Sequence, residues 1–294
     1  MTAPFGRMLT AMITPFGSDG GVDHGTAWEL ARHLVDTGSD GIVVGGTTGE
    51  SPTLSEDEKV ALFRGVVEAV GKRAMVVAGT GTYDTAESIH LTRRAVETGV
   101  DGVMAVTPYY SRPSQQGLYE HFSAIADASD VPVLLYNIPS RTGRLIEVDT
   151  LARLSAHPRI VAVKDAVGDL SFTTRTLLTC SEGFAVYSGD DVLTLPIMAV
   201  GGAGIVSVAA HLAGEQIKAM VDAAVAGDWE EARRLHLGLT PLFTALFVEP
   251  NPTPVKAALD AMWRPVGRPR LPLVAASEET VGAVKEALAA ARAL

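Results

Sequence analysis

Short apolar runs rich in β-branched residues recur about every 30 residues along the chain. They are continuous and do not alternate with polar residues, which is typical of parallel strands covered on both faces. Between them, apolar residues repeat with the period of an amphipathic helix. The runs predict eight strands, at Leu9–Ile13, Gly41–Val44, Met75–Ala78, Gly102–Val106, Val133–Tyr136, Ile160–Val163, Phe184–Tyr187 and Gly204–Val208.

Seven helices are predicted between these strands, and two of them begin with recognisable signals. Ser55 and Glu58 form a capping box, and Asp190 with Asp191 places carboxylates ahead of a helical run. The helices are expected at Thr26–Asp36, Ser55–Val70, Ala86–Thr98, Gln115–Asp127, Val148–Ser155, Ser171–Leu178 and Val192–Val200.

The strict alternation of strands with helices favours a closed α/β barrel of the (β/α)8 TIM type. An open doubly wound sheet is the alternative, but its first βα turn usually carries a glycine fingerprint, which this sequence lacks. After the eighth strand the chain is predicted to be helical, at His211–Ala226, Asp228–Phe247, Thr253–Met262 and Ser277–Leu294. We expect residues 1–226 to form a barrel with the active site, and residues 227–294 a C-terminal helical appendage packed on it.

Charge and composition narrow the function. The net charge of −10 argues against a nucleic acid or an anionic membrane as partner, because neither surface would attract the chain. The N-terminus lacks the pattern of a signal peptide, no apolar stretch reaches membrane-span length, and the single cysteine, Cys180, allows no intrachain disulfide. The histidines show no metal-ligand spacing. We therefore expect a soluble cytoplasmic protein without a metal site.

The apolar run at Ile160–Val163 is followed directly by Lys164. Partial burial disfavours the ammonium form and lowers the pKa of a lysine, which produces a neutral amine able to attack a carbonyl group. The alternative is a lysine that extends to solvent or pairs with the adjacent Asp165. This segment alone favours the structural alternative, so the other strand ends have to be considered with it.

Catalytic groups of a barrel lie where its strands end. The segment GGTTGES at 45–51 combines glycines, two hydroxyls and backbone N–H groups into a cradle suited to a carboxylate, although a plain glycine turn is the alternative. Tyr136 ends the fifth strand, where aromatic residues commonly serve packing. Asp190 and Asp191, after the seventh strand, form a helix cap or, as the weaker alternative, a metal site.

Together these strand ends predict Schiff-base chemistry. We place Lys164 across the barrel mouth from Tyr136, with Thr47 and Thr48 on the same rim. Capture of a carbonyl substrate by an amine needs the amine, a proton shuttle for dehydration of the carbinolamine, and an anchor for the acid group of the substrate. The lysine, the tyrosine and the threonine segment supply one of each.

Several motifs occur in the order expected of one enzyme family. They are GGTTGES (45–51), VTPYYSRPSQQGLYEHF (106–122), LYNIPSRTG (135–143), VAVKDA (161–166), YSGDD (187–191), GGAGIVSV (201–208) and NPTPVKAAL (251–259). By these motifs nearly the whole chain resembles the dihydrodipicolinate synthase (4-hydroxy-tetrahydrodipicolinate synthase) family, in the pyruvate-dependent class I aldolase superfamily of N-acetylneuraminate lyase. The resemblance implies an enzyme that condenses pyruvate with L-aspartate 4-semialdehyde to 4-hydroxy-tetrahydrodipicolinate, the entry to diaminopimelate and lysine. It implies no cofactor, only a covalent imine on the protein.

The resemblance also implies a role for each matching residue. The catalytic residues would be Lys164, which forms the imine with pyruvate, and a proton relay of Tyr136, Thr47 and Tyr110. The substrate-binding residues would be Thr48, Arg141, Gly189 and Val206. Arg141 would bind the carboxylate of the aldehyde, a task that suits a planar guanidinium fork. The family is usually a homotetramer of two tight dimers, in which Tyr110 would reach into the neighbouring subunit.

A regulatory pocket at the dimer interface is implied as well, at the positions of Ser51, Glu56, Lys59, Tyr83, Glu87 and Tyr109. Lysine-inhibited members of the family have an asparagine where this chain has Tyr83, and histidines near its Glu56 and Lys59. We therefore expect feedback inhibition by lysine to be weak or absent.

Two alternative functions stay open on the sequence. A sibling aldolase acting on N-acetylneuraminate or 2-keto-3-deoxygluconate would share Lys164 and Tyr136, but Arg141 suits a short aldehyde with its own carboxylate. A catalytically inactive barrel that senses a metabolite is the second alternative. The intact lysine, tyrosines and threonines at five separate positions argue against it.

Overall fold

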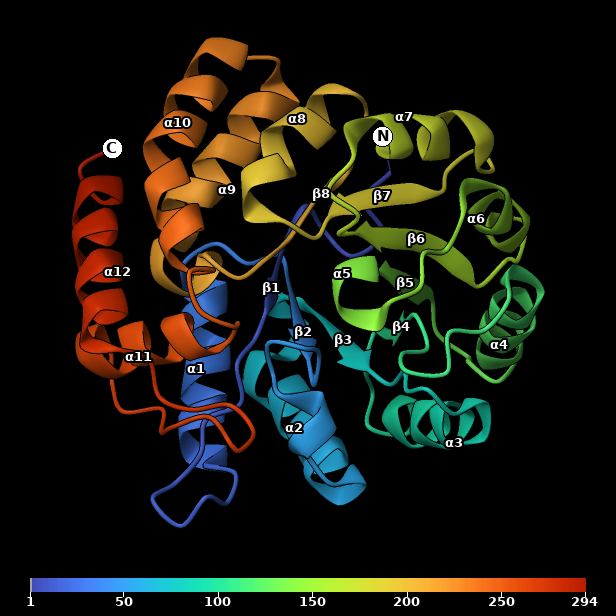
Figure 1. Cartoon of the computed structure of the whole chain (residues 1–294), viewed down its shortest axis with the longest axis horizontal. Coiled ribbons are helices and arrows are strands. Elements are labelled where there is room, and N and C mark those ends of the chain that lie inside the picture. Colours follow the sequence, from blue (N-terminus) through green and yellow to red (C-terminus); the bar gives the residue numbers. More distant parts are fainter. Residues whose placement is uncertain (1) are drawn as a thin grey trace.

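The computed structural model describes residues 2–294. Its centre is a closed barrel of eight parallel strands in chain order, with the last strand beside the first (Figure 1). The TIM-barrel prediction is confirmed, and each strand begins and ends within two residues of its predicted bounds. The strands are β1 (Met8–Ala11), β2 (Gly41–Val44), β3 (Met75–Gly79), β4 (Gly102–Val106), β5 (Val133–Asn137), β6 (Ile160–Asp165), β7 (Ala185–Ser188) and β8 (Gly204–Ser207).

Helices surround the barrel on its outer side (Figure 1). The predicted capping box is present at the start of the second helix, where Ser55 Oγ accepts a hydrogen bond from the Glu58 N–H and the Glu58 carboxylate accepts one from the Ser55 N–H. These outer helices are α1 (His24–Asp36), α2 (Glu56–Val70), α3 (Thr85–Val96), α4 (Gln115–Asp127), α6 (Val148–Ser155), α7 (Leu170–Thr179) and α8 (Thr194–Ala199).

Several short elements differ from the prediction. The helix expected at Val192–Val200 is divided into the 3₁₀ turn η3 (Asp191–Leu193) and α8, because Asp190 caps η3 through the Val192 N–H. Helix α5 (Pro139–Thr142) was not predicted, since four residues are too short for a hydrophobic period. Two further 3₁₀ turns were not predicted, η1 (Ser51–Thr53) and η2 (Gly71–Arg73).

The C-terminal helices lie together on one side of the barrel, beside α1 (Figure 1). Their apolar side chains belong to the same continuous core as those of the barrel helices, for example Leu242, Val255 and Leu288 with Leu30. The stretch 249–254 contains the buried Asn251 and the start of the third of these helices. They are α9 (Ala210–Ala226), α10 (Trp229–Ala245), α11 (Thr253–Met262) and α12 (Glu278–Ala291).

The barrel interior is filled by side chains over most of its length. A separate apolar cluster includes Phe5, Leu9, Leu134 and Tyr187. The Tyr187 hydroxyl lies at the N-terminal end of the strands, where it donates to the Gly6 carbonyl at 2.9 Å and accepts from the Phe5 N–H at 3.2 Å. A substrate therefore has room only at the carboxyl ends of the strands.

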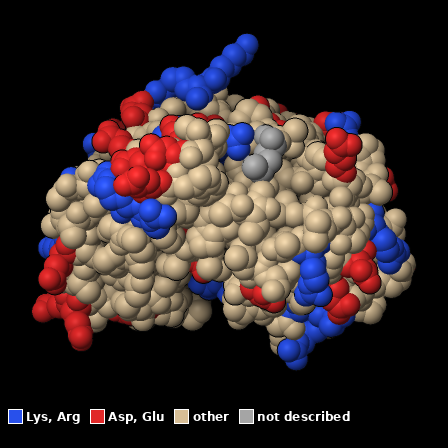
Figure 2. Space-filling view, turned by 90° about the horizontal axis from the view of Figure 1, so that it is seen from above, with Lys and Arg blue, Asp and Glu red and all other residues tan. Residues whose placement is uncertain are grey.

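The surface shows no gathering of one charge on the face drawn in Figure 2. Acidic and basic side chains are interspersed there, with broad uncharged areas between them. None of the helices within residues 2–294 combines the length and the apolar character that a membrane crossing requires.

Candidate active site

Lys164 and Tyr136 lie side by side at the carboxyl ends of β6 and β5. The two strands pair with Tyr136 opposite Lys164, so both side chains leave the sheet on the same face. Each residue is 4% exposed, and the lysine Nζ lies 4.3 Å from the centre of the tyrosine ring. Our placement of the two residues across the barrel mouth is wrong, because the strands that carry them are direct neighbours.

Burial changes the pKa of both groups. It lowers the pKa of Lys164 to about 8, with Arg141 acting in the same direction and the Asp191 carboxylate against it. It raises the pKa of Tyr136 to about 12, while Arg141 and a hydrogen bond with Thr47 work in the opposite direction. At neutral pH the tyrosine is therefore a proton donor, and the lysine retains a substantial neutral fraction.

The seventh and eighth strands shape the surroundings of the lysine. A side chain at Gly189 would meet Ala166 Cβ at 2.8 Å and Lys164 Cε at 3.1 Å, so only glycine leaves the lysine its space. Val206 is buried on β8, inside the barrel. Gly189 thus bounds the lysine sterically.

Asp191 has a role that the sequence analysis missed. Asp190 is the helix cap, whereas Asp191 is buried and accepts hydrogen bonds from Ser207 Oγ and from the backbone N–H groups of Val208 and Ala209. It ties η3 to the end of β8 and acts electrostatically on Lys164. No group of three or more His, Cys, Asp or Glu within residues 2–294 is arranged to hold a metal ion.

The turn after β2 brings its two threonines to the site in different ways. Thr47 lies close enough to the Tyr136 hydroxyl to lower its pKa, and Thr48 Oγ1 accepts a hydrogen bond from Asn251 Nδ2 at 2.9 Å. Asn251 belongs to the C-terminal region, 203 positions away, and was missed as a site residue. Asn251 begins the motif NPTPVKAAL, but no local pattern indicates its contact with Thr48. Close approach of the turn to β3 requires Gly79, because a Cβ there would lie 2.4 Å from the Gly45 carbonyl oxygen.

A cavity of about 230 Å³ opens above these residues. Arg141, on α5, lines one side of it, and its guanidinium lies 3.5 Å from the Asn251 carbonyl oxygen. Tyr136, in the lining, adjoins Lys164 on the next strand. The lining comprises Gly45, Gly46, Thr47, Ser51, Pro52, Gly79, Gly81, Met104, Val106, Tyr109, Tyr136, Ile138, Arg141 and Thr142.

Tyr110 lies apart from this cavity within the single chain. Its side chain is 95% exposed, and its backbone has a positive φ of 67°. Its neighbour Tyr109 lines the cavity and packs edge-to-face on Tyr83, with ring centres 5.2 Å apart. The structure thus brings together the other expected catalytic residues but not Tyr110.

The remaining positions of the expected regulatory pocket lie on α2 and α3. Glu56 pairs with Arg94 at 2.5 Å and with His90 at 2.9 Å. Lys59 is buried, which lowers its pKa, while Glu87 and Glu56 counteract this. Glu56 is therefore already engaged by basic side chains of the same chain.

The closed barrel, with an amine buried beside a tyrosine at its carboxyl end, defines a class of enzyme that captures carbonyl substrates covalently. Comparison with known proteins narrows the class. Residues 4–291 match the model of the dihydrodipicolinate synthetase family. The 4-hydroxy-tetrahydrodipicolinate synthase of Moorella thermoacetica is 58% identical over 98% of this chain and 97% of its own length.

Solved structures agree with this result. Dihydrodipicolinate synthase DapA-2 from Bacillus anthracis has a TM-score of 0.94 and 49% identity, over 98% of this chain and 99% of its own. The enzyme from Cyanidioschyzon merolae, solved with lysine bound, has a TM-score of 0.97 and 46% identity over all of both chains. The chain belongs to the dihydrodipicolinate synthetase family. It is therefore an enzyme, of the lyase class, and neither alternative function of the sequence analysis is favoured.

Proposed function

We propose that Lys164 condenses pyruvate with L-aspartate 4-semialdehyde to give 4-hydroxy-tetrahydrodipicolinate, for lysine and diaminopimelate biosynthesis. The observation that carries this proposal is the buried amine beside Tyr136, with a pKa lowered to about 8. At pH 7 about a tenth of such an amine is neutral, against about three in ten thousand for an ordinary lysine. No cofactor is needed, because the imine itself activates pyruvate.

The chemistry follows from the positions of the side chains. The neutral Lys164 amine attacks the keto carbon of pyruvate, and the resulting carbinolamine loses water to form the imine. Tyr136, still protonated at neutral pH, donates a proton to the departing hydroxyl, and its contact with Thr47 provides a relay. Loss of a methyl proton then gives an enamine, whose carbon attacks the aldehyde. The amino group of the aldehyde substrate finally displaces the lysine as the ring closes.

Two groups near the cavity are suited to bind the carboxylates of the two substrates. Thr48 and the neighbouring backbone N–H groups would hold the pyruvate carboxylate, while the Arg141 fork would bind the carboxylate of the aldehyde. Gly189 and Val206 would bound the imine by shape. Replacement of Arg141 by alanine is expected mainly to raise KM for the aldehyde, with imine formation from pyruvate retained.

Tyr110 would complete the relay from a neighbouring subunit in a homotetramer built of two tight dimers. Its 95% exposure leaves it free to do so. A hybrid formed from Tyr110→Phe and Tyr136→Phe chains should then recover activity that each variant lacks. We place the enzyme in the cytoplasm, since its one half-buried cysteine, Cys180, fits a reducing compartment.

Borohydride trapping tests the central step. Incubation with pyruvate and borohydride should add one pyruvate-derived group to the peptide that contains Lys164, and a coupled assay with both substrates should show turnover. Lys164→Ala should abolish both. A wild-type protein that forms no adduct, or an adduct on another residue, would refute the proposed function.

A further inference from the structure

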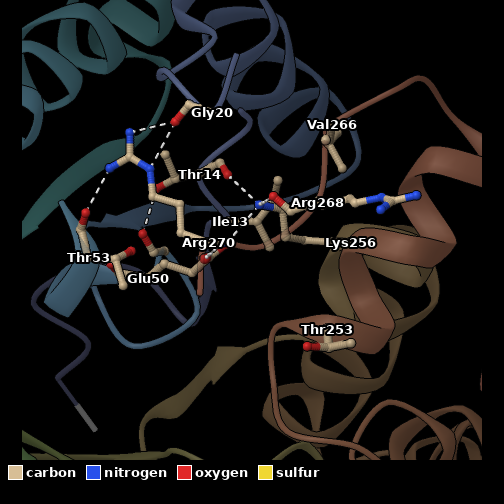
Figure 3. A network of polar contacts seen from close by, with 12 residues as sticks. Ile13, Thr14, Gly20, Glu50, Thr53, Thr253, Lys256, Val266, Arg268 and Arg270 are labelled. Atoms are coloured by element: carbon tan, nitrogen blue, oxygen red, sulfur yellow. Dashed lines mark hydrogen bonds and ion pairs between the residues drawn. The ribbon is translucent and has the colours of Figure 1, made fainter. Parts of the chain in front are cut away.

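The turn that carries Thr47 and Thr48 is held by the C-terminal region as well as by the barrel. Lys256 reaches from α11 toward Glu50, the third residue after Thr47 (Figure 3). Its Nζ lies 2.8 Å from Glu50 Oε1, and both side chains are 1% exposed. Glu50 itself has a left-handed backbone, with a φ of 56°, at the point where the turn enters η1.

The other N–H groups of the Lys256 ammonium donate to backbone carbonyl groups. It donates to the Thr14 carbonyl at 3.0 Å and to the Arg268 carbonyl at 3.4 Å, and it lies 4.2 Å from the centre of the Phe16 ring. The Thr14 hydroxyl in turn donates to the Gly49 carbonyl at 2.7 Å. One ammonium therefore fixes two consecutive residues of the turn, Glu50 directly and Gly49 through Thr14.

Two further contacts complete this attachment. The second carboxylate oxygen of Glu50 accepts the Arg270 N–H at 2.8 Å, and Asn251 donates to Thr48 as described above. The Glu50 N–H donates to the Thr47 carbonyl at 3.0 Å. A displacement of Glu50 would therefore be transmitted to Thr47 by one hydrogen bond.

The cost of removing two charges from water indicates that this ion pair does more than stabilise the fold. A buried ion pair loses the hydration of both charges, and hydrophobic residues of similar volume often stabilise a protein as well or better. They would not, however, fix a carboxylate in one orientation by directed hydrogen bonds. Among the acceptors of Lys256, Glu50 belongs to the turn that faces the cavity, and Thr14 bonds Gly49 of the same turn.

We propose that Lys256 is a positioning residue for the reaction: its ion pair with Glu50 fixes the turn that presents Thr47 to Tyr136 and Thr48 to the pyruvate carboxylate. This inference rests on the proposed function and adds to it a requirement for a residue outside the barrel. Lys256 acts through Glu50 and touches no substrate.

The test compares Lys256→Met with the double variant Glu50→Gln/Lys256→Met and with Thr253→Val. The single variant leaves the Glu50 charge buried without its ion-pair partner, and the double variant removes both charges. Thr253 is the control, since it lies on the same helix but its hydroxyl bonds the Val274 carbonyl. Thermal unfolding is recorded for each, and steady-state kinetics with both substrates at a temperature where all four proteins are folded.

We expect Lys256→Met to lower the unfolding midpoint and to lower kcat/KM for pyruvate about 10²-fold, the size expected of a misplacement near 1 Å. The double variant should recover the midpoint but not kcat/KM, and Thr253→Val should keep the wild-type kinetics. Recovery of kcat/KM together with the midpoint would overturn the positioning role, as would a single variant with a lower midpoint and unchanged kinetics. If the wild-type protein itself traps no pyruvate, the proposed function fails; normal wild-type trapping with unchanged variants rejects the positioning role alone.

Discussion

Lys164 and Lys256 are both buried, but they have different partners. The Lys256 ammonium donates to a carboxylate and to two carbonyl groups. The Lys164 ammonium has no hydrogen-bond acceptor among residues 2–294 and faces the ring of Tyr136. A buried charge without acceptors is costly, so the pKa of Lys164 is lowered and a larger fraction of it is the neutral amine that a nucleophile needs. Burial lowers the pKa of both lysines, but Lys256 has a carboxylate beside it that counteracts the shift through a direct hydrogen bond.

The same burial should make Lys164 a burden on stability. Its pKa of about 8 in the folded protein lies below the ordinary value of 10.5, so the unfolded chain binds more protons between these pH values. Folding stability therefore rises with pH across that window. Lys164→Met is expected to raise the free energy of unfolding at pH 7 by up to about 3 kcal/mol, a gain that fades between pH 8 and pH 10.5.

Urea unfolding of both proteins at several pH values measures this difference. Arg32→Met, a change of an exposed cation, is the control. A Lys164→Met protein that is less stable than wild type at pH 7 would contradict a penalty for the buried amine.

A site residue could be predicted when its own segment of the sequence determines its position, and not when distant residues determine it. Lys164 and Tyr136 were found from the ends of their own strands. Asp191 was recognised only as a cap or metal ligand, because its partners lie at the end of β8. Asn251 was missed, since its contact with Thr48 spans 203 positions and only the packed C-terminal region creates it.

At the level of elements, the strands followed from the sequence because each is a continuous apolar run, and the long helices because their apolar residues repeat with the helical period. The exceptions were short or divided elements. α5 has four residues, with Pro139 at its start and Gly143 in a left-handed conformation at its end. This small element places Arg141 over the cavity, so the least predictable element carries a residue that the proposal assigns to substrate binding.

Helices α2 and α3 bear on the response to lysine. Glu56 is engaged by Arg94 and His90, and the rings of Tyr83 and Tyr109 pack edge-to-face on each other. We expect L-lysine at concentrations near 1 mM, the upper end of ordinary metabolite affinities, to leave the rate largely unchanged. Initial rates over a lysine series test this, and strong inhibition in that range would refute it. Tyr83→Asn is the informative variant, since it should increase sensitivity to lysine.

For the molecule as a whole, we expect folding stability to be limited by acidic pH. Burial lowers the pKa of His121 and of His211 to about 4, against an ordinary value of 6.5. The unfolded chain therefore binds more protons between pH 4 and 6.5, so stability falls as the pH drops through that range. Each histidine contributes up to about 3 kcal/mol of this loss.

His121 is the better site at which to test this effect. Its Nδ1 contacts Thr85 and its Nε2 is buried without a partner among the described residues, whereas His211 uses both nitrogens. His121→Phe should flatten the dependence of the free energy of unfolding on pH below 6.5, with a smaller effect at pH 7.5. Urea titrations at four pH values measure it, and an unchanged slope would contradict the assignment.

The contact between Lys256 and Glu50 joins positions 206 residues apart, and this has a consequence for how the enzyme is made. Long-range contacts form late, because the chain between them must first be ordered. During synthesis, the strand that precedes Glu50 leaves the ribosome long before Lys256 has been added to the chain. Full catalytic efficiency is therefore expected only after the C-terminal helices have been made and have packed against the turn.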